Sequence, residues 1–135
     1  MAYMKPDDIV TIGIPALDDQ HQGLVSVVND MYEEIAVCGT LDEERVLTGK
    51  FLETLQEYAR VHFEDEEAIL VKNKYPKVSR HKEQHRLFIK ELQKIRDHYA
   101  SGELALSFDV FLFSREWIAN HINVSDQEYS KFLNL

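Results

Sequence analysis

The sequence is poor in the residues that mark several classes of protein. Its 135 residues include one cysteine, Cys38, so no internal disulfide can form and a reducing compartment suits the chain. No apolar run approaches the roughly 20 residues of a membrane span, and the start lacks the apolar stretch of a secretion signal. Lysine and arginine number 15 against 24 acids, and the formal net charge of -9 disfavours nucleic acid and anionic membranes. We therefore expect a cytoplasmic protein that neither binds nucleic acid nor spans a membrane.

Apolar residues make up 44% of the chain and recur at steps of three and four, which is the spacing of amphipathic helices. The three prolines lie outside the long periodic segments, and Asp18 or Asp19 is a plausible N-cap for the first of them. The predicted helices cover residues 18–37, 41–73, 79–100 and 106–122. Long helices with short connections predict an all-α, up-down-up-down four-helix bundle in a single domain, 1–135. An irregular N-terminal arm (1–17) precedes the bundle (18–124), and a short tail (125–135) follows it.

Histidine lies on the apolar stripe of every predicted helix. His62 and Glu66 are four residues apart, which places them about 40° from each other around a helix. Asp65 lies about 60° from His62 on the other side and competes for the same role, although Glu66 fits the stripe better. His81 and His85 repeat the four-residue spacing, and two imidazoles one turn apart can chelate one metal ion.

The first and fourth helices contribute His21 and His121. Asp126 follows His121 by five residues, about 140° away on a regular helix, and can share its site only if the helix ends between them. The intervening IleAsnValSer makes such an end plausible. His98 lies about 140° from His85 and is predicted to face solvent, so we exclude it.

These polar residues favour a metal site when they are taken together. A lone histidine on an apolar stripe is usually a hydrogen-bonded core residue, and Glu66 alone would more often lie at a boundary. Five histidines and a glutamate on inner stripes would each cost about 1 to 3 kcal/mol if left unpaired. A shared metal ion satisfies all of them at once. Imidazole and carboxylate ligands bind several metal ions, zinc and manganese among them.

Four segments resemble the ligand motifs of one family. IGIPALDDQH ends at His21, HFEDE covers 62–66, HKEQH covers 81–85 and HINVSD covers 121–126. In the same order they are similar to the motifs of the hemerythrins, and in particular of the single-domain bacterial members called bacteriohemerythrins. All seven ligand positions carry the expected residue type, and the resemblance covers nearly the whole chain.

The resemblance implies a non-haem di-iron centre that binds dioxygen reversibly. The implied metal ligands are His21, His62, Glu66, His81, His85, His121 and Asp126. One iron would take the three histidines at 81, 85 and 121, and the other would take His21 and His62. Glu66 and Asp126 would bridge the irons together with a hydroxo or oxo group. The two-histidine iron would keep one position open for dioxygen.

The resemblance also implies an apolar dioxygen pocket, formed by Leu24, Phe63, Trp117, Ile118 and Ile122. Ordinary core packing is compatible with this role. Tyr129 resembles a family tyrosine near the site.

The function implied is dioxygen carriage, storage or supply to an oxygen-using enzyme, without enzymatic activity of its own. An oxygen-sensing module read by a signalling partner is an alternative. Di-iron peroxidase or oxidase chemistry and nitric oxide handling are further alternatives.

Overall fold

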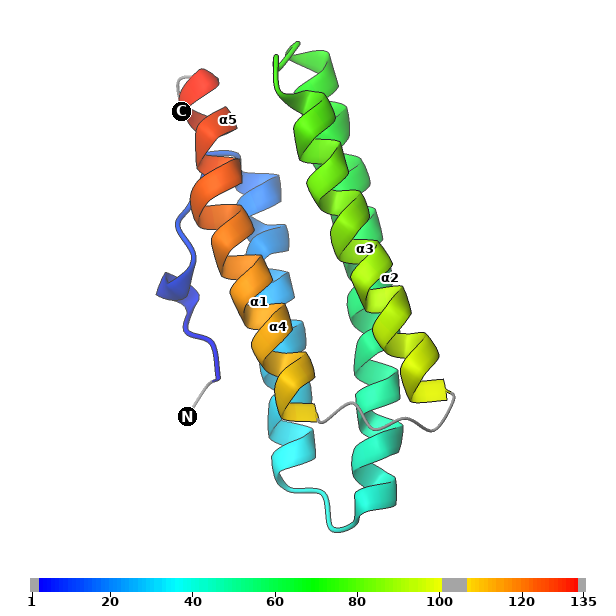
Figure 1. The fold of residues 1–135 in the computed structure, drawn as a ribbon. Helices are drawn as coiled ribbons and strands as arrows, with labels where there is room; N and C mark the ends of the chain where they lie inside the picture. Colours follow the sequence, from blue (N-terminus) through cyan, green and yellow to red (C-terminus); the bar gives the residue numbers. More distant parts are fainter. Residues whose placement is uncertain (1–2, 101–106, 134–135) are drawn as a thin grey trace.

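Four long helices run alternately up and down and form the bundle (Figure 1). The computed structural model describes residues 3–100 and 107–133, and this part of the chain contains helices and no strands. The helices are α1 (Pro15–Ala36), α2 (Leu41–Lys72), α3 (Val78–Ala100) and α4 (Ser107–Asn120). A short 3-10 turn, η1 (Pro6–Asp8), lies in the arm, and α4 continues into η2 (His121–Asp126) and α5 (Gln127–Phe132). The predicted all-α bundle is confirmed.

Most of the predicted helix limits agree with the structure to within a residue or two. The second helix begins at Leu41 because the Thr40 side chain accepts a hydrogen bond of 3.1 Å from the Glu43 N–H, as an N-cap residue does. The predicted start of the fourth helix at 106 lies outside the described residues. Beyond 122 the chain stays helical as far as Phe132, in η2 and α5, so one or two further helical turns lie in the tail.

The N-cap predicted at Asp18 or Asp19 is wrong, because α1 already begins at Pro15. Proline is favoured at the first helical position, where its fixed φ suits the helix and its missing N–H costs nothing. Gly13 turns the chain into the helix with a φ of 92°, which glycine adopts without strain. The Asp18 carboxylate instead accepts hydrogen bonds from the Ile12 N–H (2.8 Å) and the Gly13 N–H (3.2 Å), and so ties the arm to α1.

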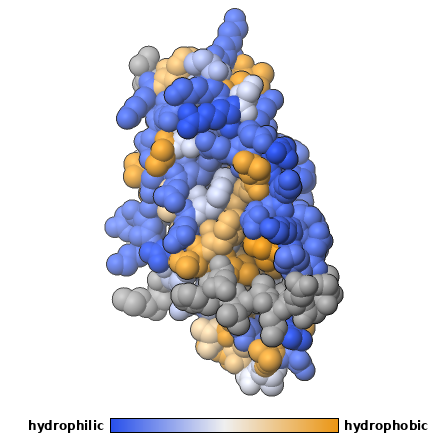
Figure 2. Space-filling model, viewed as in Figure 1, coloured by the Kyte–Doolittle hydropathy of each residue, from blue (hydrophilic) through white to orange (hydrophobic). Residues whose placement is uncertain are grey.

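The core lies along the bundle axis, and charged side chains lie outside it. Figure 2 shows one face of the molecule as largely hydrophilic, with a narrower apolar band between hydrophilic borders. The predicted stripe of the first helix is buried at His21, Leu24, Val28 and Met31. Among the described residues, none of the helices combines the length and apolar character that a membrane crossing requires.

Helices α1 and α2 approach each other closely where Tyr58 lies over Gly23. The Tyr58 hydroxyl donates a hydrogen bond of 2.9 Å to the Gln20 carbonyl. A Cβ atom on Gly23 would lie 1.8 Å from that hydroxyl oxygen and 2.7 Å from the ring carbon that bears it. Glycine at this position therefore allows α2 to hold the turn of α1 that carries His21.

We expect Gly23→Ala to destabilise the protein by about 1 to 3 kcal/mol, because the added methyl displaces the Tyr58 ring and breaks its hydrogen bond. The gain in helix propensity, about 1 kcal/mol, offsets only part of this cost. Denaturant unfolding monitored by circular dichroism measures the change. Gly39→Ala is the control, because its nearest neighbour would lie 4.0 Å away. Equal stability of the two variants would contradict the close packing.

Candidate metal centre

The fourth helix does not end between His121 and Asp126, so the predicted helix end is wrong. It widens instead into the π-helical turn η2, in which hydrogen bonds join residues five apart. His121 and Asp126 therefore lie one above the other on the inner face, with 6% and 0% of their surface exposed. The Nε2 atom of His121 lies 3.2 Å from Oδ1 of Asp126.

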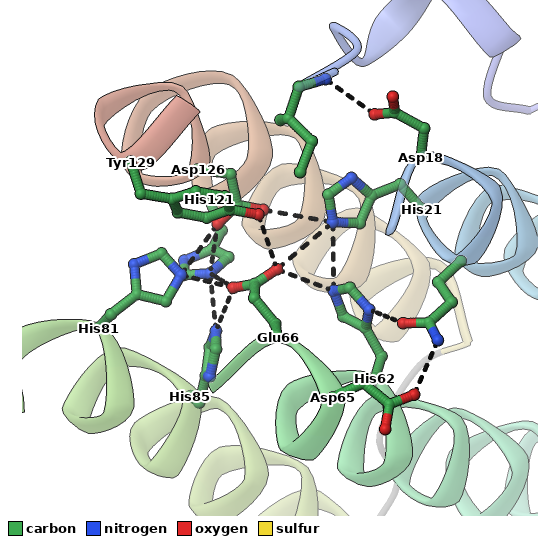
Figure 3. Close-up of polar contacts among 12 residues, drawn as sticks. Asp18, His21, His62, Asp65, Glu66, His81, His85, His121, Asp126 and Tyr129 are labelled. Atoms are coloured by element: carbon green, nitrogen blue, oxygen red, sulfur yellow. Dashed lines mark hydrogen bonds and ion pairs between the residues drawn. The ribbon is translucent and has the colours of Figure 1, made fainter. Parts of the chain in front are cut away.

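The histidines of the four helices converge on Glu66, which stands at the centre of the cluster (Figure 3). One group consists of Glu66 with three histidines, and a second consists of Glu66 with His21 and His62. The three histidines of the first group are His81, His85 and His121. Within each group the potential ligand atoms lie within 4.8 Å of one another. All members are buried, whereas Asp65 and His98 are exposed and stand outside both groups.

The two carboxylate oxygens of Glu66 face different groups. Oε1 lies 2.5 Å from Nε2 of His81 and 3.1 Å from Nε2 of His85. Oε2 lies 3.2 Å from Nε2 of His62 and 3.6 Å from Nε2 of His21. A carboxylate in this position can join two cations, one on each side.

Asp126 repeats this division from the opposite wall. Its Oδ1 lies 2.9 Å from Nε2 of His81, and its Oδ2 lies 3.3 Å from Nε2 of His21. Tyr129, one turn further on, donates a hydrogen bond of 3.3 Å to Oε2 of Glu66. Burial raises the pKa of the Tyr129 hydroxyl, which keeps it neutral and able to donate.

The donor set of the cluster fits metal ions. The Nε2 atoms of His21 and His62 lie 3.1 Å apart, and those of His85 and His121 lie 2.9 Å apart. At these distances the two nitrogens of a pair cannot both direct lone pairs at each other, so a proton or a metal cation must lie between them. Both oxygens of the fully buried Asp126 also lack a hydrogen-bond donor. Imidazole nitrogens with bridging carboxylates suit iron.

Glu66 stays ionised in the metal-free protein, and protons on nearby imidazoles take part of the cation's place. Burial lowers the pKa of His21 and of His81, but the adjacent carboxylates of Asp126 and Glu66 outweigh burial and raise each pKa to about 9. Burial would raise the pKa of Glu66, yet hydrogen bonds from the surrounding histidines, that of His121 first, hold it well below its usual range. Metal binding must therefore release protons from these imidazoles.

Apolar side chains cover the cluster on one side. Leu24, Phe63, Ile118 and Ile122 are all buried in the main core. The Phe63 ring stacks on the His85 ring, with centroids 3.8 Å apart.

Trp117 is half-buried and stacks on His121 with ring centroids 4.4 Å apart. The two rings line a surface pocket of about 370 Å³ that also includes Leu87 and Val124. Trp117 thus covers one face of the His121 ring and leaves little of it exposed.

Two polar neighbours of the cluster were not found from the sequence. Gln20 accepts a hydrogen bond of 2.6 Å from Nδ1 of His62, and Glu67 accepts one of 2.8 Å from Nδ1 of His85. Glu67 belongs to an acidic run that reads as a solvated helix face. These two residues could have been sought on chemical grounds, because an imidazole that binds metal through one nitrogen needs a hydrogen-bond acceptor for the other.

Comparison with known proteins agrees with this geometry. The sequence profile of the family described as hemerythrin HHE cation binding domain matches residues 12–133. A bacteriohemerythrin of Stenotrophomonas maltophilia is 28% identical over 130 residues, which are 96% of this chain and 81% of that protein. A bacteriohemerythrin of Methylococcus capsulatus is 30% identical over 117 residues, 87% of this chain and 86% of that protein. A solved structure of wild-type hemerythrin superimposes with a TM-score of 0.81 at 27% identity, covering 100% of this chain and 99% of that one.

The fold and the cluster define a class of protein: a four-helix bundle with a histidine-rich metal site between its helices. Within that class, the chain belongs to the hemerythrin family.

Proposed function

We propose that this protein binds dioxygen reversibly at a di-iron centre in the middle of the bundle. The ligands proposed are His21, His62, Glu66, His81, His85, His121 and Asp126. The observation that carries the proposal is the division of each buried carboxylate between two groups of imidazoles. Relatives named bacteriohemerythrin and myohemerythrin support it. When bound, two ferrous ions would supply the electrons and the coordination position for dioxygen.

The protein's ligands make the two iron positions unequal. His81, His85 and His121 serve one position, whereas only His21 and His62 serve the other. The shared Glu66 and Asp126, with a bridging hydroxo or oxo group, contribute to both. We therefore place dioxygen on the side of His21 and His62, where an imidazole is missing.

The side chains around the ligands exclude water and hold the carboxylates in place. Buried Leu24, Phe63, Ile118 and Ile122 form the apolar wall that we assign to the dioxygen pocket. The Tyr129 hydroxyl holds one oxygen of Glu66 by its hydrogen bond. A dry wall of this kind slows the entry of water and protons, which would promote irreversible oxidation of the irons by dioxygen.

In the cell this chemistry would serve carriage, storage or supply of dioxygen. We propose that the chain acts as one hemerythrin-like domain, in the cytoplasm, as a binding protein and not as an enzyme.

Optical spectroscopy tests the proposal. The protein is loaded with Fe(II) without oxygen, oxygen is admitted, and the sample is then degassed. A visible charge-transfer band that forms with oxygen and disappears on degassing is the expected result. Direct conversion to a plain ferric spectrum, or turnover of added peroxide or nitric oxide without a reversible band, would overturn the proposal in favour of enzymatic or sensor chemistry.

We expect Ile118→Thr to oxidise irreversibly about tenfold faster in air than the unchanged protein, because a hydroxyl in the apolar wall attracts water. Ile118 is 1% exposed and lies three residues before His121. Ile118→Val is the matched control, since it removes similar volume without adding a polar group. The decay of the oxygenated band gives the rate, and equal rates for the two variants would place Ile118 outside the pocket.

A further inference from the structure

The two sides of the cluster differ in how they hold the outward nitrogens of their imidazoles. Nδ1 of His85 donates a hydrogen bond of 2.8 Å to a carboxylate oxygen of Glu67. Nδ1 of His62 donates one of 2.6 Å to Oε1 of Gln20, a neutral amide. Both imidazoles have 2% of their side-chain surface exposed, so little water competes for either bond. Both bonds leave the Nε2 lone pair free to point into the cluster.

Asp65 sets the orientation of the Gln20 amide. The Gln20 NH2 group donates a hydrogen bond of 2.9 Å to Oδ2 of Asp65. An ionised carboxylate only accepts hydrogen bonds, so it selects the NH2 end of the amide and leaves the carbonyl for His62. Figure 3 shows Asp65 beside His62 on the outer side of the cluster. This exposed acid therefore acts on the buried imidazole through one intermediate residue.

Glu67 and Gln20 differ in charge, and the charge of the acceptor changes how strongly the imidazole donates its Nε2 lone pair to a metal ion. A hydrogen bond to a carboxylate is roughly twice as strong as one to a neutral amide, and it makes the imidazole a better metal ligand. His85 receives this support from Glu67. On the other side, His62 has the neutral Gln20, and Nδ1 of the buried His21 has no hydrogen-bond partner. In the described part of the chain, no carboxylate thus accepts a hydrogen bond from Nδ1 of His62 or of His21.

We infer that Gln20, oriented by Asp65, is a positioning residue for His62, and that its neutral amide makes the His21–His62 position hold metal more weakly than a carboxylate would. This inference rests on the proposed di-iron centre. The two positions then differ through the polarity of their surroundings as well as through the number of imidazoles. The His21–His62 position, which we propose as the dioxygen side, is the one whose imidazoles have no charged hydrogen-bond acceptor.

Iron release from the loaded protein tests this inference. The Fe(II)-loaded protein is challenged anaerobically with a ferrous chelator, and release is expected in a fast phase from the His21–His62 position and a slow phase from the other. Gln20→Leu should speed the fast phase about tenfold and leave the slow phase unchanged. Glu67→Gln should speed the slow phase instead.

The informative variant carries Gln20→Glu together with Asp65→Asn. The second change supplies an NH2 donor to the introduced carboxylate and avoids two facing acids. The double variant should slow the fast phase about tenfold, a gain that loss of packing could not produce. Glu64→Gln is the control, because this exposed neighbour bonds to Arg60 and should leave both phases unchanged.

Mössbauer spectra of the same samples assign the phases to the two irons. The Gln20 variants should shift the signal of one iron, and Glu67→Gln should shift the signal of the other. Unchanged fast release and unchanged spectra in the Gln20 variants would overturn the inference while the di-iron centre stands. If the wild-type protein does not bind two irons, the proposed function itself is overturned.

Discussion

Glu66→Gln is expected to reduce the iron held by the purified protein from a pair of ions per chain to one or none. The carboxylate of Glu66 is fully buried, and its two oxygens face the two groups of imidazoles separately. A glutamine has the same shape but only one oxygen to offer. Its NH2 group would donate to the Nε2 lone pair of His81 or His62 and satisfy that nitrogen without a metal ion. An iron assay on protein of known concentration measures the loss.

The same substitution at Glu64 isolates the role of the buried carboxylate. Glu64 lies two residues earlier on α2, is exposed and pairs with Arg60 at 2.9 Å. We expect Glu64→Gln to retain its iron. Full iron retention by Glu66→Gln would show that Asp126 alone can join the two positions, and would contradict the role proposed for Glu66.

The bundle was predictable because its helices have regular patterns. Steps of three and four place His21, Leu24 and Val28 on one face of α1, and these residues are buried. The same arithmetic separates Glu66 from Asp65, since four residues exceed a full turn by about 40° and three fall short of one by about 60°. Both distinctions depend on local helix geometry alone, which is why they could be predicted before the neighbouring helices were placed.

The geometry at His121 and Asp126 could not be predicted in this way. A regular helix separates residues five apart by about 140°, so a break seemed necessary between them. The chain instead keeps its helix and changes its hydrogen bonding, which a π-helical turn does at the cost of less favourable geometry. That choice depends on tertiary contacts, because Asp126 reaches His81 of α3 and His21 of α1 only from the widened turn.

Gln20 and Glu67 were missed for a related reason. Gln20 is half-buried on α1 and faces a histidine of α2, and Glu67 on α2 faces a histidine of α3. Each contact depends on how far one helix is rotated against the next. The apolar periodicity of the sequence predicts which face of each helix is buried. It does not predict which side chains at the edge of that face contact the neighbouring helix.

Removal of the iron is expected to lower the free energy of unfolding by about 4 kcal/mol when free Fe(II) had been at roughly a thousand times its Kd. For a domain of this size the loss corresponds to a fall in Tm of about 10 °C or more. The physical cause is the burial of Glu66 and Asp126, whose charges then lack the cations that offset their desolvation. Thermal unfolding before and after treatment with a chelator measures the change, and adding Fe(II) back should restore the Tm.

The metal-free chain should nevertheless stay helical. The pKa values of His21 and His81 rise to about 9 in the absence of metal, so at neutral pH these imidazoles carry protons beside the two carboxylates. Protons thus replace part of the cationic charge, and the apolar core of the bundle is unaffected. Far-ultraviolet circular dichroism should change little while the Tm falls. Glu66→Gln is the control, since a variant that holds little iron should show little change with the chelator. Loss of all helix on chelation would mean that the metal is required for folding itself.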